Sequence, residues 1–311
     1  MQTILGANGI IATEVAKELH LKYTKKIRLV SRKPKRVNDT DQLFSADLLK
    51  EQQTADAVKG SEIVYLTVGI PYNAQLWKEQ WPVIMKNVIR ACKLHEAKLV
   101  FFDNVYMYGP VNGIMTEETP FKPAGTKGMV RAEVTRMLLE EMNQGDLTAV
   151  ICRSPEFYGP RNTVSTMTAT IFDNIKKKKK LQVFVSDSTM RTFIYTPDAG
   201  RATALIGNTP DAYDQTWHLP CDTGRLTLRQ FIQLVSAKHG KDLEYMVLRK
   251  WMIRLIALFH PVVKEITELL YQFDRDYIFD CTKFNKRFPD FETTPVEKGI
   301  EEILAEPGYV Y

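Results

Sequence analysis

The stretch that decides the fold lies at the start of the chain and reads Thr3-Ile4-Leu5-Gly6-Ala7-Asn8-Gly9-Ile10-Ile11-Ala12. Residues 3–5 predict a short buried strand, and the residues from Ile10 onward predict a helix with one apolar face. Gly6 permits a tight turn close to a phosphate, and Gly9 opens a helix whose N-terminal amides suit a pyrophosphate. This GxxGxxA pattern predicts a dinucleotide site formed by Gly6, Asn8, Gly9, Ile10 and Ile11.

Strands and helices alternate along the first half of the chain. Further strands are predicted at 27–30, 61–68, 97–102 and 148–153. Helices are predicted between them, at about 49–58, 82–94 and 130–142. Strands separated by helices form right-handed βαβ units. The pattern therefore predicts an α/β fold with a parallel sheet, and the sequence contains no internal repeat or low-complexity linker.

The composition is that of an ordinary globular protein. The chain has 311 residues, of which 44% are hydrophobic, and 42 Lys and Arg against 37 Asp and Glu give a net charge of +5. This length suits about two domains or one large α/β unit, and so dilute a charge argues against nucleic acid as a partner. Four separated cysteines without a CxxC pair, and no HxxxH or HExxH motif, predict no metal site and favour a reducing compartment.

No segment is predicted to enter a membrane. The N-terminus carries no secretory signal, and no apolar run approaches the ~20 residues that span a bilayer, so we expect a cytoplasmic protein without a membrane partner. The most apolar stretch is 251–263, which contains Arg254 and His260. We interpret it as a core helix, with docking to a partner or membrane surface as the alternative. The five lysines at 176–180 are interpreted as a solvated helix end.

The residues after the second strand bear on the choice of cofactor. NAD enzymes usually place Asp or Glu there, where the carboxylate binds the ribose 2′-hydroxyl. This chain has Ser31, Arg32 and Lys33 instead. A hydroxyl and two cations suit a 2′-phosphate, because a guanidinium binds phosphate through a bidentate fork. The sequence therefore favours NADP over NAD.

A series of motifs then follows in a fixed order. They are Asp47-Leu48, Thr67-Val68-Gly69, Asn87, 153–160 (RSPEFYGP), 191–198 (RTFIYTPD), Thr227-Leu228-Arg229 and 280–283 (DCTK). In this order they resemble the motifs of the extended short-chain dehydrogenase/reductases, in the NAD-dependent epimerase/dehydratase family. The resemblance runs along nearly the whole chain.

The resemblance implies a Rossmann-type, doubly wound parallel sheet with a smaller, discontinuous C-terminal substrate domain. The expected cofactor domain spans 1–160, with segments near 186–220 returning to it, and 161–311 form mainly the substrate domain. A homodimer through the helices near 82–94 and 130–142 is the association that the family suggests.

The resemblance also assigns ligand contacts. The expected cofactor contacts are Asp47 and Leu48 at the adenine, with Thr67, Val68, Gly69, Lys127 and Pro155 along the rest of the dinucleotide. The expected contacts to a small-molecule substrate are Tyr72, Glu156 and Arg191. Arg191 matches an arginine that holds the pyrophosphate in nucleotide-sugar members, which suits a cation in a polar cleft.

The catalytic motif of the family is altered. Catalysis there uses a Ser or Thr, and a Tyr and Lys spaced YxxxK on one helical face. Residues 102–109 (FDNVYMYG) resemble SSxxVYG, which places Asn104 at the Ser/Thr position. Lys127 and Arg131 then take the Tyr and Lys positions, and a shift of two residues would place Gly125 and Met129 there.

Three interpretations of this change stay open. Lys127, beside Arg131 and an oxidised nicotinamide, acts as an unusual base, or Tyr106 or Tyr108 takes that role. Alternatively, binding geometry supplies most of the rate and a solvent-linked group supplies the proton. In the third interpretation the chain is a non-catalytic NADP-binding sensor or scaffold. We expect an oxidoreductase or epimerase/dehydratase-like enzyme that acts on a hydroxyl or ketone, including sugar and nucleotide-sugar derivatives.

Glu156 is a second departure, because the family motif has Asn there. An amide donates and accepts hydrogen bonds, whereas a carboxylate only accepts. Glu156 either faces a substrate that carries donors or a cation, or pairs with Arg153 or Arg161 as part of the structure.

Overall fold

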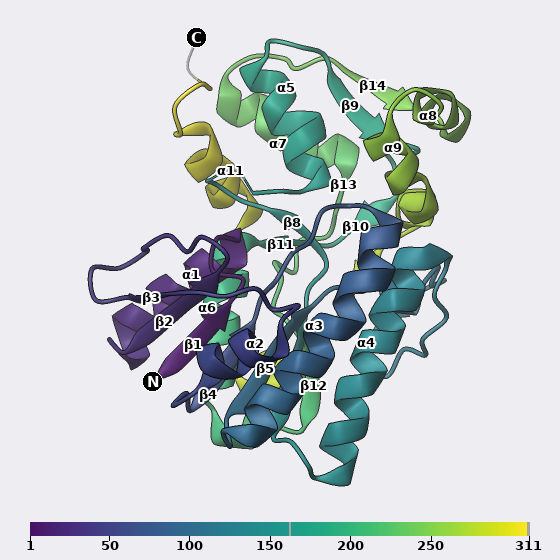
Figure 1. Ribbon diagram of the computed structural model, residues 1–311. Helices are drawn as coiled ribbons and strands as arrows, with labels where there is room; N and C mark the ends of the chain where they lie inside the picture. Colours follow the sequence, from purple (N-terminus) through teal and green to yellow (C-terminus); the bar gives the residue numbers. More distant parts are fainter. Residues whose placement is uncertain (162, 310–311) are drawn as a thin grey trace.

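A seven-stranded parallel sheet forms the centre of the computed structural model, which describes residues 1–161 and 163–309 (Figure 1). The strand order is β12-β7-β5-β4-β1-β2-β3, and every neighbouring pair is parallel. The strands are β1 Gln2–Leu5, β2 Ile27–Ser31, β3 Gln42–Ser45, β4 Ile63–Leu66, β5 Lys98–Asp103, β7 Ala149–Arg153 and β12 Gln215–His218. The predicted doubly wound α/β fold is confirmed.

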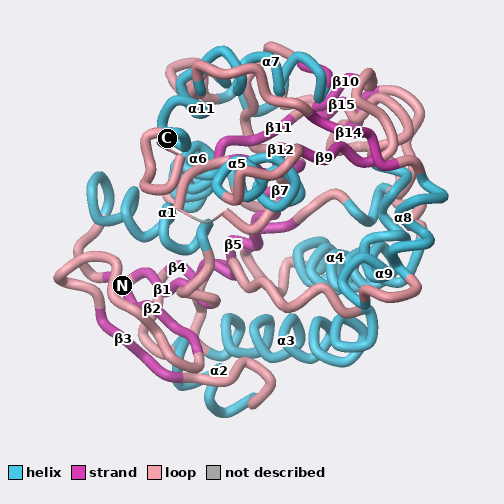
Figure 2. Tube along the Cα trace, turned by 90° about the horizontal axis from the view of Figure 1, so that it is seen from above, coloured by secondary structure: helices cyan, strands magenta, loops and turns pink. Residues whose placement is uncertain are grey.

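Helices cover both faces of this sheet, so its central strands are buried on both sides. One face carries α1 Ile10–Glu18 and α6 Thr196–Gly207; the other carries α2 Glu51–Val58, α3 Ala74–Leu94 and α4 Gly125–Gln144 (Figure 2). Successive strand residues alternate between the two layers. Ile4 packs in the α1–α6 layer, and Leu5 packs in the α2–α3–α4 layer.

The strand order places a crevice beside β1. From β1 the chain builds outward to β2 and β3, then returns to the other side of β1 with β4 and continues to β5, β7 and β12. The loops after β1 and β4 therefore diverge at the carboxyl edge of the sheet. Ligands of open α/β sheets bind at this kind of switch point.

A second, smaller core lies beyond the carboxyl edge of the sheet. It is built by η3 Thr168–Phe172, α5 Asp173–Lys176, β9 Leu181–Phe184, α7 Leu228–His239, β14 Tyr245–Leu248 and α11 Val296–Leu304. A parallel pair, β8 Glu156–Tyr158 and β11 Phe193–Tyr195, contributes Tyr158, Phe193 and Tyr195 to this core. After β11 the chain returns to the main sheet, where β12 forms the edge strand next to β7.

Short elements complete the chain. They are η1 Leu19–Tyr23, η2 Tyr106–Tyr108, β6 Ile114–Met115, β10 Met190–Arg191, η4 Pro210–Ala212, β13 Leu226–Thr227, α8 Lys250–Ala257, α9 Pro261–Ile266, η5 Thr267–Gln272, β15 Ile278–Phe279 and α10 Thr282–Arg287. Among the described residues no helix is long and apolar enough to cross a bilayer. Nor do three His, Cys, Asp or Glu side chains of the described part come together as a metal site requires.

Two expected helices differ in the structure. The stretch 251–263 does not form one core helix, because α8 ends at Ala257 and α9 begins at Pro261. Of the residues of α8, Ile253 and Ala257 are buried, whereas Trp251 and Leu255 are exposed. Of the lysines interpreted as a helix end at 176–180, only Lys176 lies in α5, and the following lysines form a turn that leads into β9.

Candidate active site

The turn after β1 has the geometry of a phosphate cradle. Gly6 has φ +96°, and a Cβ at this position would lie 2.8 Å from the Cα and N of Val68. Its amide donates to Val30 O at 2.9 Å, and the Gly9 amide donates to Gly6 O at 3.0 Å. Gly9 precedes α1, whose first turn contains no acidic residue. Backbone amides at a helix N-terminus bind anions, so this turn fits the pyrophosphate of a dinucleotide.

The loop after β2 is joined to this turn by Asn8. Its amide nitrogen donates to Lys33 O at 2.8 Å, and its oxygen accepts from Lys35 N at 3.1 Å. The side chains of Arg32 and Lys33 are exposed. The Ser31 hydroxyl is buried and has no hydrogen-bond partner among the described residues. A cofactor in the cradle would therefore meet two exposed cations at the end of β2, next to the buried Ser31 hydroxyl.

The remaining expected cofactor residues also lie along the carboxyl edge of the sheet. Asp47 accepts from Leu49 N at 3.1 Å and shapes the turn after β3. The Leu48 carbonyl accepts from Asn87 on α3 at 2.9 Å, so the family asparagine holds this loop in place. Thr67 is buried, with its hydroxyl on Leu5 O at 3.0 Å.

Three other expected contacts differ in exposure. Gly69 is exposed, and a Cβ there would meet nothing within 4 Å. Val68 lies against Gly6, where its backbone leaves no room for a Cβ on Gly6. Pro155 is buried behind the end of β7.

Lys127, at the family's tyrosine position, is completely buried near the start of α4. Its Nζ donates to Glu265 Oε2 at 2.5 Å, to Glu265 O at 2.9 Å and to Glu268 Oε1 at 2.6 Å. An ammonium has three protons and no acceptor, so all three are used in this conformation. We call Lys127, Glu265 and Glu268 the lysine cage; with both carboxylates ionised its formal charge is −1.

The same two glutamates hold other backbone groups. Glu268 Oε2 accepts from Thr126 N at 2.6 Å, and Glu265 Oε2 accepts from Ala74 N at 2.9 Å. They therefore bind the first turns of α4 and α3 as well as the ammonium. Sequence reasoning missed them because no local pattern connects 265–268 with residue 127.

Arg131, at the family's lysine position, forms a buried ion pair with Asp103 at the end of β5. Its Nε donates to Asp103 Oδ1 at 2.9 Å, and Nη2 donates to the same oxygen. Thr135 donates to Asp103 Oδ2 at 2.9 Å, and the guanidinium stacks 4.3 Å from the centre of the Trp81 ring. With its donors committed to a buried carboxylate, Arg131 connects α4 to the sheet.

Tyr108 lies in the core of the first domain. Its hydroxyl accepts from Arg153 Nη1 at 2.6 Å and lies 2.8 Å from His218 Nε2. The other ring nitrogen of His218 bonds to Asp280 O at 2.8 Å, and the ring stacks on Phe279 with the ring centres 3.9 Å apart. Burial lowers the pKa of His218 to about 3 and raises the pKa of Tyr108 to about 12. Tyr108 therefore belongs to the packing of the sheet, and we leave it out of the proposed site.

Tyr106 and Tyr72 meet at the carboxyl ends of β5 and β4. Their hydroxyls are hydrogen-bonded to each other, and the Lys127 ammonium lies 5.8 Å from the centre of the Tyr72 ring. Asn104 accepts from Tyr106 N at 2.9 Å and so fixes the turn that carries this tyrosine. Burial raises the pKa of both phenols. The expected residues Asn104, Tyr106, Tyr72 and Lys127 are thus brought together on one side of the crevice.

Glu156 pairs with Arg191, whereas the structural alternative stated above named Arg153 or Arg161. Glu156 Oε2 accepts from Arg191 Nη2 at 2.5 Å, while the other Arg191 nitrogen, Nη1, donates to Gln272 O. Arg161 instead pairs with Glu14 at 2.8 Å. A carboxylate already neutralises Arg191, so this arginine does not present a single uncompensated cation to a ligand.

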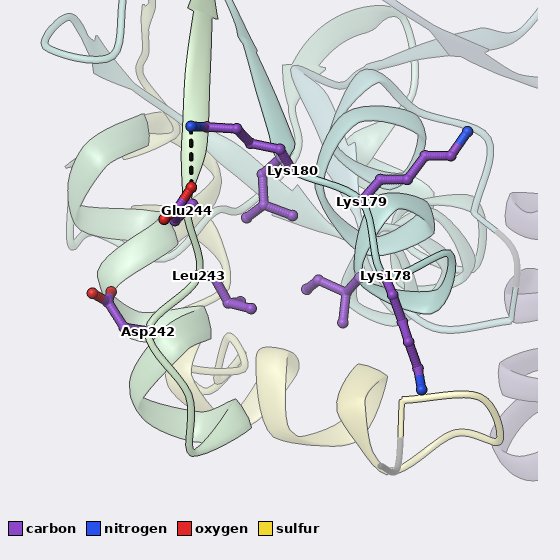
Figure 3. Close-up of a pocket in the computed structure, with 8 residues that line it drawn as sticks. Lys178, Lys179, Lys180, Asp242, Leu243 and Glu244 are labelled. Atoms are coloured by element: carbon purple, nitrogen blue, oxygen red, sulfur yellow. Dashed lines mark ion pairs between the residues drawn. The ribbon is translucent and has the colours of Figure 1, made fainter.

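A surface hollow of about 220 Å³ lies apart from these residues, in the second domain. It is lined by the end of α5, the turn that follows it and the residues just before β14. Figure 3 shows Lys180 turned toward Glu244, with which it forms an ion pair at 3.1 Å, while Lys179 points away. The lysine run thus borders a charged, partly neutralised depression and is not part of the crevice.

The family assignment follows from a sequence comparison that agrees with this geometry. A profile of the NAD-dependent epimerase/dehydratase family matches residues 3–219. This chain belongs to that family. The match confirms the resemblance stated above, and the family is one of enzymes. No curated protein sequence matches the chain.

Solved structures agree with the fold over nearly its whole length. UDP-glucuronic acid 4-epimerase from Bacillus cereus, in complex with NAD, has a TM-score of 0.79 at 15% identity, with 97% of each chain covered. UDP-glucose 4-epimerase from Thermotoga maritima, with UDP-glucose, has a TM-score of 0.78 at 16% identity, covering 98% of this chain and 97% of that one. A dTDP-glucose 4,6-dehydratase variant from Streptomyces venezuelae, with NAD bound, has a TM-score of 0.78 at 14% identity, covering 98% and 95%.

Proposed function

We propose that this chain binds NADP(H) and reduces a carbonyl group, with Tyr106 as the proton donor in place of the family's YxxxK tyrosine. The observation that carries the proposal is the hydrogen-bonded pair of Tyr72 and Tyr106 at the carboxyl edge of β4 and β5. The pair stands beside the switch point of the sheet, where the cradle at Gly6 would hold the dinucleotide.

The cofactor preference rests on the loop after β2. Arg32 and Lys33 are exposed next to the cradle, and no carboxylate stands at the position that usually binds a ribose 2′-hydroxyl.

The direction of the reaction follows from the protonation of the two phenols. Burial raises the pKa of Tyr106 well above its usual value and also raises that of Tyr72, so both remain protonated at neutral pH. A protonated phenol can give up a proton but cannot abstract one, which suits reduction, and the raised pKa makes it a weaker acid than an exposed tyrosine. A bound nicotinamide would supply the hydride that forms the new C–H bond. Tyr106 gives its proton to the carbonyl oxygen as C=O becomes C–OH, and Tyr72, which is 40% exposed and hydrogen-bonded to Tyr106, passes on a proton taken up from solvent.

The substrate class follows from the charges beside this pair. Arg191 is neutralised by Glu156, and the lysine cage has a formal charge of −1. A diphosphate would meet no net positive charge there. Carboxylate oxygens accept hydrogen bonds from hydroxyl groups, so we propose an uncharged, hydroxylated carbonyl compound such as a sugar derivative without a diphosphate.

Binding and turnover assays test this proposal together. NADPH and NADH affinities are measured by cofactor fluorescence, and NADPH oxidation is followed with a panel of free aldoses, ketoses, simple carbonyls and nucleotide-sugars. We expect turnover with uncharged hydroxylated carbonyls, and a fall in kcat of about 10²–10⁴-fold in Tyr106→Phe. Tyr23→Phe, a change at a partly exposed tyrosine near α1, is the matched control. Turnover that survives Tyr106→Phe unchanged would remove Tyr106 from the mechanism.

The lysine cage favours a second candidate function, a non-catalytic NADPH sensor. Every proton of Lys127 is already hydrogen-bonded, and Arg131 is committed to Asp103. Neither residue at the altered YxxxK positions is available to a substrate in this conformation. A sensor would bind NADPH and change the hydrogen-exchange protection of 261–272, which carries both glutamates, without turning over any carbonyl of the panel.

A further inference from the structure

Helix α8 exposes an apolar face on the second domain. Trp251, Leu255 and Leu258 are spaced i, i+4 and i+7, so they share one side of the helix. Trp251 is 63% exposed and Leu258 is 73% exposed. Ile253 and Ala257, on the opposite side, are buried and join α8 to the molecule.

The residues after α8 enlarge this surface. Phe259 is 80% exposed in the turn that leads to α9, and Val262 in α9 is also exposed. Figures 1 and 2 place α8 and α9 at the outer edge of the molecule. We define the α8 patch as Trp251, Leu255, Leu258, Phe259 and Val262. Contiguous exposed apolar residues of this size mark an interaction surface.

The charge around the α8 patch has one sign. Residues 245–264 contain four Lys and Arg and no Asp or Glu, so this segment carries +4 of the chain's net +5. Arg249, Arg254 and Lys264 are exposed and form no ion pair with a described residue, while Lys250 pairs with Asp274. The carboxylates of Glu265 and Glu268, which follow in the chain, are bound to Lys127.

We propose that the α8 patch docks on the surface of an anionic bilayer. An amphipathic helix with Trp, Phe and Leu on one side and Lys and Arg beside them lies in the headgroup region, with its apolar side chains inserted. Each cation near an anionic leaflet adds about 1 kcal/mol of attraction. The proposal takes up the alternative stated for 251–263, docking at a membrane surface, in which the helix lies on the membrane without spanning it.

A second copy of the chain is a poorer occupant of this surface. A two-fold interface brings identical patches together, so Arg254 and Lys264 of each copy would meet cations of the same sign. The patch also protrudes along a helix and a turn, which suits insertion between lipid headgroups. The proposal does not depend on the carbonyl reductase function, because none of its residues belongs to the crevice.

The chain contains its own reporter for the test. Trp251 is exposed, whereas Trp77, Trp81 and Trp217 are all buried, so a blue shift of tryptophan emission on adding vesicles reports on α8. We expect this shift, together with co-sedimentation, with vesicles of phosphatidylcholine and phosphatidylglycerol. Pure phosphatidylcholine should bind much more weakly, and high salt should weaken binding to the anionic vesicles, because salt screens exposed charges.

Three variants of the full chain complete the test. The double variant Leu258→Asn and Phe259→Asn should lower vesicle affinity at least about tenfold, since it removes apolar insertion. Arg254→Glu changes the charge by two units and should lower it roughly tenfold to thirtyfold. The matched control is Leu21→Asn with Leu94→Asn, two apolar residues of similar exposure (72% and 68%) outside the patch, which should bind like the wild type.

Two results would overturn the proposal. The first is that the wild type binds anionic vesicles no better than neutral ones, or that the Leu258/Phe259 variant binds as tightly as the control. The second is a dimer in sedimentation velocity that the Leu258/Phe259 variant converts to a monomer, without any vesicle binding by the wild type. An unchanged melting temperature shows that the substitutions at these exposed positions leave the fold intact.

Discussion

The two sides of the crevice are built in different ways. On the cofactor side, the cradle at Gly6 and the loop at Ser31–Lys33 depend on backbone conformation in adjacent strands near the N-terminus. On the opposite side, Lys127 and Arg131 are held by side chains from distant parts of the chain. The turn on the cofactor side requires glycine at fixed positions. The side-chain partners on the opposite side can be substituted without disturbing the strands. The chain therefore keeps the family fold although Lys127 and Arg131 stand at the positions of the family's proton-transfer residues.

The largest effect is expected at the buried ion pair of Arg131 and Asp103. Arg131→Met leaves Asp103 without its main partner, and breaking a buried pair in this way costs about 3–5 kcal/mol. The free energy of unfolding in urea measures it. Arg90→Met, which removes an exposed pair with Glu51 at 2.9 Å, is the control and should cost below ~1 kcal/mol. Similar losses in both variants would contradict a structural role for Arg131.

The next effect tests the cofactor side. Gly6→Val forces a side chain into a φ of +96° and against the backbone of Val68. Strain of this kind costs about 1–3 kcal/mol, so NADPH affinity measured by calorimetry should fall roughly tenfold to a hundredfold. Gly224→Ala, where a Cβ meets nothing closer than 3.4 Å, is the control. Wild-type affinity in Gly6→Val would show that the dinucleotide does not approach this turn.

A pH effect tests whether the Tyr108–His218 cluster is structural. Burial lowers the pKa of His218 to about 3, below the value of about 6.5 in an unfolded chain. The unfolded state therefore binds the proton first, and stability present above pH ~6.5 is lost as the pH falls toward 3. Between pH 7 and pH 5 this one group should cost about 2 kcal/mol in the free energy of unfolding.

The control for this pH effect is a histidine on the surface. His20→Gln should keep the dependence on pH, whereas His218→Gln should reduce its slope over the same range. An identical slope in both variants would mean that the pKa of His218 is the same in the folded and unfolded states.

The smallest effect concerns the 2′-phosphate. Arg32→Ala removes one exposed cation beside the cradle, and a charge-assisted hydrogen bond is worth about 1.5–3 kcal/mol when it is formed. We expect NADPH affinity to fall about tenfold while NADH affinity stays the same, as measured by fluorescence titration. Arg36→Ala is the matched control, because Arg36 bonds to Asp39 O at 2.5 Å. Tighter binding of NADH than of NADPH by the wild type would reject the assignment of Arg32 and Lys33.

The sequence predicts the fold well because the fold depends on local patterns. The GxxGxxA turn and the alternation of apolar strands with helices are visible within short windows. The lysine cage could not be predicted, because Glu265 and Glu268 lie far along the chain from Lys127 and match no motif. The pairing of Glu156 with Arg191 was missed for a related reason: it depends on the register of β8 against β11, which places Glu156 opposite Phe193.

The sequence predicted a core helix at 251–263, but composition alone does not show whether the apolar face of a helix packs inside the protein or faces outward. The apolar spacing of Trp251, Leu255 and Leu258 is the same in a helix that packs in a protein core and in a helix that lies on a lipid surface. The turn at 258–260 and Pro261 separate it from α9, and this break leaves one face of α8 without a described partner.

We propose that proton transfer has moved from α4 to Tyr106 while the cofactor side of the crevice is retained. The most direct test is transfer of deuterium from C4-deuterated NADPH to a carbonyl, followed by mass spectrometry of the product under single turnover. Lys127→Arg keeps the positive charge but cannot lose its proton. We expect transfer by the wild type and by Lys127→Arg, and a rate about 10²–10⁴-fold lower in Tyr106→Phe. Loss of transfer in Lys127→Arg, with full activity in Tyr106→Phe, would contradict it.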